Sequence, residues 1–318
     1  MRIIPAVAAL WLFSLVSLGM ASAQPAPSFI AMWGSFGSGP GQLYYPYGIT
    51  ISPDGFVYVS DQYNFRIVQY TTNGQFVRSW GSRGRGPGQF DLTIGLGIDP
   101  AGHVYVADYG NSRVQVFNRD GVFLRQWPAQ DARDVAISPD GSVHVVAVRG
   151  SQVDVFTPDG NPVRSYGGGE IGSPTSIAFD AAGNSYVVNE GGPGNGSRQT
   201  VTKWSPAGAL LAMWGSGGTG PGHLGGVAGV AVDATGNVYV VEHQTNRLQV
   251  FDPAGSLIGL WGTTGSGAGQ FIEPVDVALD AAGLIYVVDM YNHRIQKFGN
   301  LPVMTSRVSW GALKSRFR

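Results

Sequence analysis

The chain has 318 residues, enough for a large core, with a net charge of −1 and only 13% charged residues. This balance excludes the dense basic face that a nucleic-acid partner would need. The absence of cysteine excludes disulfides, thiolate nucleophiles and a lipid-modified cysteine.

The first 23 residues have the pattern of a secretory signal. Arg2 supplies the positive end, residues 3–20 are apolar apart from two serines, and Ala21-Ser22-Ala23 forms a small-residue cleavage site. The alternative is an uncleaved anchor, because about 18 apolar residues nearly span a bilayer. The cleavage site favours a signal removed after Ala23. We therefore expect a secreted or periplasmic protein without a transmembrane segment after signal cleavage.

A repeated unit occupies residues 24–299, which we take as one domain. Each copy has an apolar strand, a Pro-Asp-Gly type turn, a Val-Tyr-Val type strand and an Asp-x-x-Asn-x-Arg run into a third strand. The turn glycines are spaced by 47, 39, 42, 53 and 47 residues. A period of about 40 to 50 with several short strands is typical of a propeller blade. These glycines are Gly55, Gly102, Gly141, Gly183, Gly236 and Gly283.

The second copy shows four strands. Residues 94–98 are short and apolar, 103–107 alternate, and 113–117 and 122–127 follow after further turns. Four antiparallel strands make one blade.

The strand count predicts how the ring closes. Residues 29–33 form a fourth strand before any first strand, while the last copy ends at its third strand, residues 295–298. The N-terminal strand would complete the last blade and leave no open sheet edge. We predict an all-β fold, a six-bladed β-propeller of four-stranded antiparallel blades closed by the N-terminal strand.

The last copy also carries a family resemblance. Residues 274–280, the strand Ile285-Tyr286-Val287-Val288-Asp289 and the run from Asn292-His293-Arg294 to Phe298 resemble the NHL repeat, named after Asn-His-Leu. The resemblance implies a propeller. It implies no single activity, because the same repeat serves RNA-binding, sensor and lyase proteins. Blades 1, 2, 5 and 6 follow the repeat, and blades 3 and 4 depart from it.

One face of the disc is expected to bind a partner. The turns after the second strands and the links between blades share that face and vary most, and variable loops on a rigid scaffold usually carry binding. The candidate ligand contacts on this face are Arg83, Arg85, Arg149, Glu190, Asn195, Arg198, Glu242, His243 and His293.

A polar column recurs on the same face. Its acids are interpreted as pairing with their own arginines and turn amides to fix the hairpin, and the alternative is a ring of ligand contacts. Blade 3 has Ala147 in place of the acid, and blade 4 has a glycine-rich stretch at 189–196, so a unique site is expected there. The column consists of Asp61, Asn64, Arg66, Asp108, Asn111, Arg113, Glu242, Arg247, Asp289, Asn292 and Arg294.

A second column faces the central channel. Asp134 and Asp276 stand in it on opposite blades and could share a divalent cation or an ordered water. The alternative is that each carboxylate accepts backbone N–H bonds, because two carboxylates make a poor metal cage. The five histidines do not share a column, so a zinc site is not expected. We expect no other cofactor.

Residues 300–318 lie beyond the ring as a basic tail. Trp310, Leu313 and Phe317 have helical spacing. The tail is expected to be a helix or strap that packs on the propeller, or a frayed end; the alternative is docking to a surface or membrane interface.

No catalytic residue can be named, because no Gly-x-Ser-x-Gly elbow or phosphate loop is present. The leading hypothesis is a secreted, monomeric, non-enzymatic propeller that binds a protein, a peptide or a cell-surface carbohydrate. The alternative is a metal-dependent lyase or hydrolase at the channel mouth.

Overall fold

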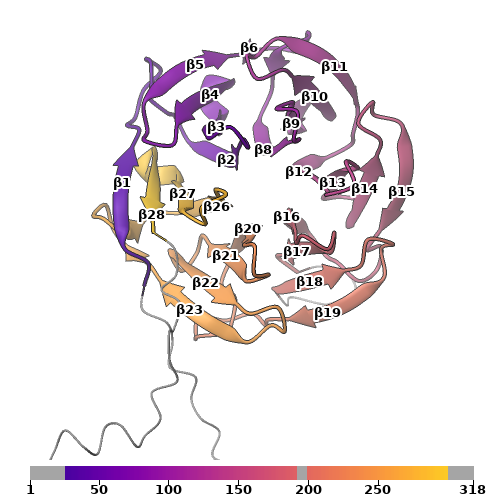
Figure 1. The fold of residues 1–318 in the computed structure, drawn as a ribbon, viewed down its shortest axis with the longest axis vertical. Helices are drawn as coiled ribbons and strands as arrows, with labels where there is room; N and C mark the ends of the chain where they lie inside the picture. The colour runs from indigo at the N-terminus through magenta and orange to yellow at the C-terminus, as the bar shows by residue number, and fades with distance from the viewer. Residues whose placement is uncertain (1–25, 192–198, 300–318) are drawn as a thin grey trace, which may run out of the picture.

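In the computed structural model, six four-stranded antiparallel sheets form a ring around a central axis (Figure 1). The structure describes residues 26–191 and 199–299. The predicted signal peptide and the tail at 300–318 lie outside this range. Within it, no helix is long and apolar enough to cross a membrane.

The blades follow one another along the chain, each running from the inner strand to the outer one. Blade 1 contains β2 (Pro46–Ile51), β3 (Phe56–Asp61), β4 (Arg66–Thr71) and β5 (Phe76–Trp80). Blade 2 contains β8 (Thr93–Ile98), β9 (Val104–Asp108), β10 (Arg113–Phe117) and β11 (Phe123–Pro128). Blade 3 contains β12 (Ala132–Ile137), β13 (Val143–Ala147), β14 (Gln152–Phe156) and β15 (Pro162–Tyr166).

The second half of the ring repeats this order. Blade 4 contains β16 (Pro174–Phe179), β17 (Ser185–Asn189), β18 (Thr200–Trp204) and β19 (Leu210–Trp214). Blade 5 contains β20 (Val227–Val232), β21 (Val238–Glu242), β22 (Arg247–Phe251) and β23 (Leu257–Trp261). Blade 6 contains β26 (Pro274–Leu279), β27 (Ile285–Asp289), β28 (Arg294–Phe298) and β1 (Phe29–Trp33).

The predicted closure is confirmed. Strand β1 pairs antiparallel with β28, with Met32 opposite Gln296 and Trp33 opposite Ile295, and so becomes the outer strand of blade 6 (Figure 1). The N-terminal strand thereby covers the sheet edge that β28 would otherwise expose.

The links between blades contain short structure that the sequence pattern did not predict. Two links fold into parallel pairs, β6 (Ser82–Arg83) with β7 (Gln89–Phe90) and β24 (Thr263–Thr264) with β25 (Gln270–Phe271). Three turns after second strands are single 3-10 turns: η1 (Gln62–Asn64), η2 (Tyr109–Asn111) and η3 (Met290–Asn292).

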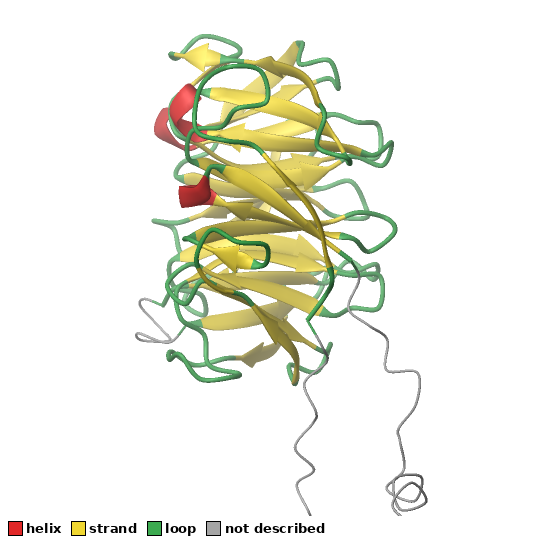
Figure 2. Ribbon diagram, turned by 90° about the vertical axis from the view of Figure 1, so that its left-hand side faces the viewer, coloured by secondary structure: helices red, strands yellow, loops and turns green. Residues whose placement is uncertain are grey.

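The two faces of the disc therefore differ. The face with the 3-10 turns and the blade links is called the linker face below, and the opposite face, with the Pro-Asp-Gly turns, is called the turn face. Figure 2 shows the three 3-10 turns together on one side of the disc.

The apolar core lies between neighbouring blades. Val57 and Val59 of blade 1 pack in one cluster with Tyr286 and Val288 of blade 6. A second cluster joins blades 5 and 6 in the same way. Because each blade buries its faces against both neighbours, the ring is stabilised by continuous apolar packing without disulfides.

Aromatic rings at the ends of outer strands fix the spacing between blades. The Trp127 ring of blade 2 lies against Gly160 of blade 3, and the Trp80 ring lies against Gly121 in the same way. A Cβ added to Gly160 would come within 2.5 Å of the Trp127 ring. A side chain at this turn would therefore separate the two blades.

The Gly160→Ala substitution is expected to destabilise the protein more than Gly141→Ala, by about 2 kcal/mol. Both glycines lie in blade 3 with nearly equal φ, +86° and +88°, so both substitutions incur the same left-handed backbone strain. A Cβ at Gly141 meets nothing within 4 Å, which makes it the matched control. Equal losses of unfolding free energy in denaturant titrations would contradict the packing role of Trp127.

Candidate functional site

The repeated polar column ties each blade link to its own blade. In blade 2, Asp108 accepts hydrogen bonds from the Asp91 amide (2.9 Å) and from Arg113 Nε (2.7 Å). Arg113 also donates to the Gly86 and Gln89 carbonyl groups, at 2.9 and 2.7 Å. Asp108 is fully buried. Its oxygens are therefore occupied by the blade itself and are not open to a ligand.

The same network recurs in three other blades. Asp61, Glu242 and Asp289 are each fully buried and each bind the arginine five residues later, at 2.8, 3.1 and 2.7 Å. Asn64, Asn111 and Asn292 donate both to their acid and to a carbonyl group of the preceding link. The arginines are Arg66, Arg247 and Arg294.

Blades 3 and 4 lack this network. Arg149 of blade 3 has a largely exposed side chain, and its Nε lies 3.5 Å from Asp131 Oδ1. In blade 4, buried Asn189 donates to the Val187 carbonyl group at 3.2 Å in place of an acid–arginine pair. The next residue, Glu190, instead contacts side chains from blades 3 and 5.

Irregular pairing at the start of each inner strand directs side chains to the channel mouth on the linker face. The β12–β13 register shifts between Ala132 and Asp134, and that of β2–β3 shifts between Pro46 and Ile49. Bulges of this kind re-aim side chains. They place Arg133 and Tyr47 at equivalent positions of blades 3 and 1.

Side chains from four blades meet at this mouth. Arg133 donates to the Tyr47 hydroxyl at 3.2 Å and lies 3.8 Å from Glu190 Oε2. Glu190 Oε1 lies 3.3 Å from His243 Nε2 of blade 5. Tyr47, Arg133, Glu190 and His243 are called the mouth cluster below. All four remain partly exposed.

The surroundings of Glu190 in the mouth cluster favour its ionised form. Burial opposes ionisation of Glu190, but the His243 hydrogen bond and the Arg133 charge outweigh it and hold the pKa of Glu190 below its ordinary value. The cluster therefore presents a fixed carboxylate beside a guanidinium and an imidazole.

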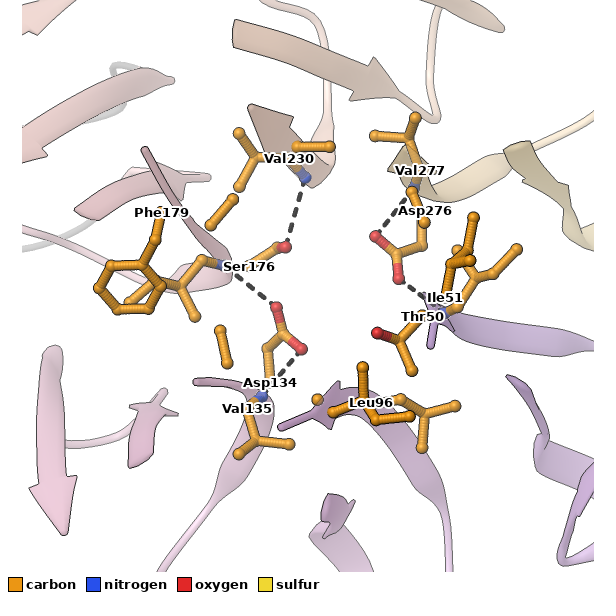
Figure 3. A pocket seen from close by; sticks show the side chains of 18 of the residues that line it. Thr50, Ile51, Leu96, Asp134, Val135, Ser176, Phe179, Val230, Asp276 and Val277 are labelled. Atoms are coloured by element: carbon orange, nitrogen blue, oxygen red, sulfur yellow. Dashed lines mark hydrogen bonds between the residues drawn. The ribbon is translucent and has the colours of Figure 1, made fainter. Parts of the chain in front are cut away.

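Deeper in the channel, Asp134, Ser176 and Asp276 point into one cavity of about 360 Å³ (Figure 3). Asp134 accepts backbone N–H bonds from Val135 at 2.8 Å and from Ile177 of the next blade at 3.0 Å. Asp276 likewise accepts from Val277 and from Ile49 of blade 1, both at 2.9 Å. Each carboxylate thus bridges two neighbouring blades.

Glycines in adjacent blades make room for these carboxylates. A Cβ on Gly95 would lie 2.0 Å from Asp134 Oδ1, and one on Gly229 would lie 2.6 Å from Asp276 Oδ1. Each aspartate of this column therefore needs a glycine at the equivalent position of the preceding blade.

The two aspartates interact electrostatically across the channel. Burial raises the pKa of Asp134 to about 6, and burial together with the Asp134 charge raises the pKa of Asp276 well above its ordinary value. In the described part of the chain, no group of three or more acidic or histidine side chains is placed to hold a metal. A cation here would take most of its ligands from water.

The free energy of unfolding of the unmodified protein should rise as the pH falls from 7 to 5, compared with that of an Asp134→Asn/Asp276→Asn double variant. In this window the folded carboxyls bind protons and the unfolded ones do not, so protonation favours the folded state. We expect a relative gain on the order of 1–3 kcal/mol in urea titrations at each pH. A pH-independent difference between the two proteins would contradict the coupling of the carboxyls.

The other residues predicted for the linker face are dispersed. Arg83 lies over the Phe65 ring at 5.2 Å, and Arg85 is exposed. Glu242 belongs to the buried column, and His293 accepts the Tyr45 amide at Nδ1, 3.2 Å away. Asn195 and Arg198 lie outside the described residues.

Sequence reasoning missed Arg133 and the aromatic residues of the first blade link. Phe36, Tyr44 and Tyr45 of this link form ring contacts with one another and with Tyr63 of η1. The run Tyr44-Tyr45-Pro46-Tyr47 was the available signal, because tyrosines in an exposed link are not required by the repeat.

These features define the class of protein as a six-bladed β-propeller with a polar mouth on its linker face. The NHL repeat matches residues 43–70, 94–117 and 271–298, so blades 1, 2 and 6 of this six-bladed β-propeller contain NHL repeats. Blade 5, with Glu242 and Thr245 in place of Asp and Asn, is not among the matched ranges.

Solved structures share the fold at low identity. Hydrazine synthase from Kuenenia stuttgartiensis is 13% identical with a TM-score of 0.61, covering 83% of this chain and 98% of that one. Virginiamycin B lyase from Staphylococcus aureus is 15% identical with a TM-score of 0.57, covering 80% and 95%. A gluconolactonase from Xanthomonas campestris is 16% identical with a TM-score of 0.60, covering 88% and 99%. The curated proteins contain no match to this sequence.

Proposed function

We propose that the protein is an extracytoplasmic binding propeller that presents its linker face, centred on the mouth cluster, to a protein, peptide or carbohydrate partner. The observation that carries this proposal is the mouth cluster itself. Four blades contribute to it, and two of its members, Arg133 and Glu190, come from blades 3 and 4, which lack the acid–arginine network of the other blades. A location outside the cytoplasm follows from the signal pattern in residues 1–23.

The chemistry of the mouth cluster suits recognition of a polar group. Arg133 supplies donors in a fixed orientation, and Glu190 supplies a carboxylate that is held ionised. Tyr47 and His243 add groups that both donate and accept. The arginine–carboxylate contact is long, at 3.8 Å, so a ligand group can compete for either partner.

The proposal can be tested with the full chain against two defined panels, a random-peptide phage library and an array of neutral and acidic oligosaccharides. We expect Glu190→Gln and His243→Ala each to weaken the selected interaction at least about tenfold. Asp120→Asn, an exposed acid on the turn face, is the matched control and should leave affinity unchanged. The proposal is wrong if neither panel yields a binder, or if both mouth variants bind like the control.

A second candidate function is a metal-dependent lyase or hydrolase in the channel. It is favoured by the electrostatically coupled pair Asp134 and Asp276, whose carboxyls face one cavity beside the mouth cluster. Structures of similar fold include a lyase and a lactonase. Elemental analysis decides the matter. A stoichiometric cation lost in Asp134→Ala would support a metal-dependent enzyme, and a metal-free protein without affinity for calcium or zinc would exclude this second candidate.

A further inference from the structure

An aromatic surface lies on the linker face where blade 6 meets blade 1. Its rings come from the first blade link, from the turn at Tyr63 and from the turn of blade 6. Ring centroids of Phe36 and Tyr44, and of Tyr45 and Tyr63, are 5.1 Å apart, and those of Tyr45 and Tyr291 are 5.0 Å apart. The rings Phe36, Tyr44, Tyr45, Tyr63, Tyr291 and His293 are called the aromatic platform below.

The fold does not require aromatic residues at these positions. The residues of the next junction that correspond to Tyr44, Tyr45 and Tyr63 are Asp91, Leu92 and Gly110. Phe36 and His293 are in contact at the junction of blades 6 and 1. The equivalent pair at the junction of blades 1 and 2 is Arg83 over the Phe65 ring. At the junction of blades 5 and 6 it is Thr264 and Asn246, which form a hydrogen bond. One geometry therefore accepts very different side chains, and of the three described junctions compared, the one between blades 6 and 1 has rings at all of these positions.

The platform is exposed where burial would normally be expected. Phe36 is 63% exposed, Tyr63 50% and Tyr291 45%. The half-buried rings of Tyr44 and Tyr45 support them from below in edge-on and tilted contacts. Such contacts fill the space between rings, so the platform offers ring faces and not a groove.

The polar atoms of the platform are also available. Within the described residues, the hydroxyls of Tyr44, Tyr45, Tyr63 and Tyr291 make no hydrogen bond. The His293 Nδ1 accepts the Tyr45 amide, so its Nε2 carries the proton in the neutral ring and faces away from that bond. Exposed rings are thus accompanied by hydroxyl and N–H groups, and the Glu273 carboxylate lies near enough for its charge to act on Tyr291.

We infer that the aromatic platform binds a neutral oligosaccharide, stacking the C–H face of a sugar on Tyr63 or Tyr291 while the tyrosine hydroxyls bond its hydroxyl groups. This deepens the proposed function, because Tyr45 and Tyr47 flank Pro46 and so join the platform to the mouth cluster. A proline-rich peptide fits less well, since such peptides dock in aromatic-lined grooves.

The test titrates the full chain with cellohexaose, chitohexaose, mannohexaose, maltohexaose and decaproline, followed by calorimetry and tyrosine fluorescence. We expect one hexasaccharide to bind and decaproline not to bind. Tyr63→Ala and Tyr291→Ala should each weaken that binding at least about tenfold. Leu92→Ala, at the position of blade 2 that corresponds to Tyr45, is the matched control and should bind normally.

Tyr63→Phe separates the contribution of ring stacking from that of the hydroxyl hydrogen bond. It retains stacking and should lose less affinity than Tyr63→Ala. Binding of decaproline alone, or glycan binding that survives both alanine variants, overturns the inference. If peptides selected by the phage library need Glu190 while no hexasaccharide binds, the inference fails and the proposed function stands. If neither probe class binds, both fail.

Discussion

A chain that starts at Gly34, and so lacks β1, should lose cooperative folding, with a cost of at least about 5 kcal/mol. Trp33 packs against the rings of Tyr70 and Tyr286, whose centroids lie 6.2 and 6.1 Å away, and it joins blade 1 to blade 6. Its removal would also expose the edge of β28 to pairing with other chains. Thermal unfolding and size-exclusion chromatography should show early melting and aggregation.

A chain lacking only residues 1–25 is the control and should fold normally. A synthetic peptide of residues 26–33 should restore the melting temperature of the truncated chain, because an added strand can complete an open sheet. The same peptide with Trp33→Ala should restore it less. A truncated chain that melts like the control would show that blade 6 does not need its fourth strand.

Replacement of Asp108 by alanine should destabilise the protein by about 3–5 kcal/mol. Asp108 is fully buried and Arg113 nearly so, and the substitution leaves the guanidinium buried without its charge partner. It also removes the acceptor of the Asp91 amide and one of the two acceptors of Gln115 Nε2. Urea titration measures the loss directly.

Asp120→Ala is the matched control for Asp108→Ala. Asp120 also pairs with an arginine, Arg78, but both side chains are exposed, and such pairs contribute about 0–1 kcal/mol. Equal losses of unfolding free energy in Asp108→Ala and Asp120→Ala would contradict the view that the polar column stabilises the blades.

The fold could be predicted from the sequence because its determinants are local and repeated. The turn glycines set the period, and the unpaired strand at residues 29–33 indicated how the ring closes. Alternation of apolar residues located the strands to within about one residue of their ends, as for β11, predicted at 122–127 and found at Phe123–Pro128. The parallel pairs in the blade links carry no such periodicity and were not predicted.

The candidate site could be predicted only in part. The loss of the repeat in blades 3 and 4 identified the region, and Glu190 and His243 were among the candidates. Arg133 was not, because its approach to Tyr47 depends on bulges in β2 and β12 that the sequence pattern does not reveal. The aromatic platform joins residues more than 240 positions apart, such as Tyr45 and Tyr291, which only the closed ring brings together.

Hydrogen–deuterium exchange of the full chain, with and without its best ligand from the two panels, tests the central claim that the linker face carries function. We predict slower exchange at saturation in residues 44–47 and 243–246, which hold Tyr47 and His243 of the mouth cluster. Residues 53–55 and 139–141 on the turn face should exchange unchanged. Protection confined to those turns, with none at the channel mouth, would contradict the claim.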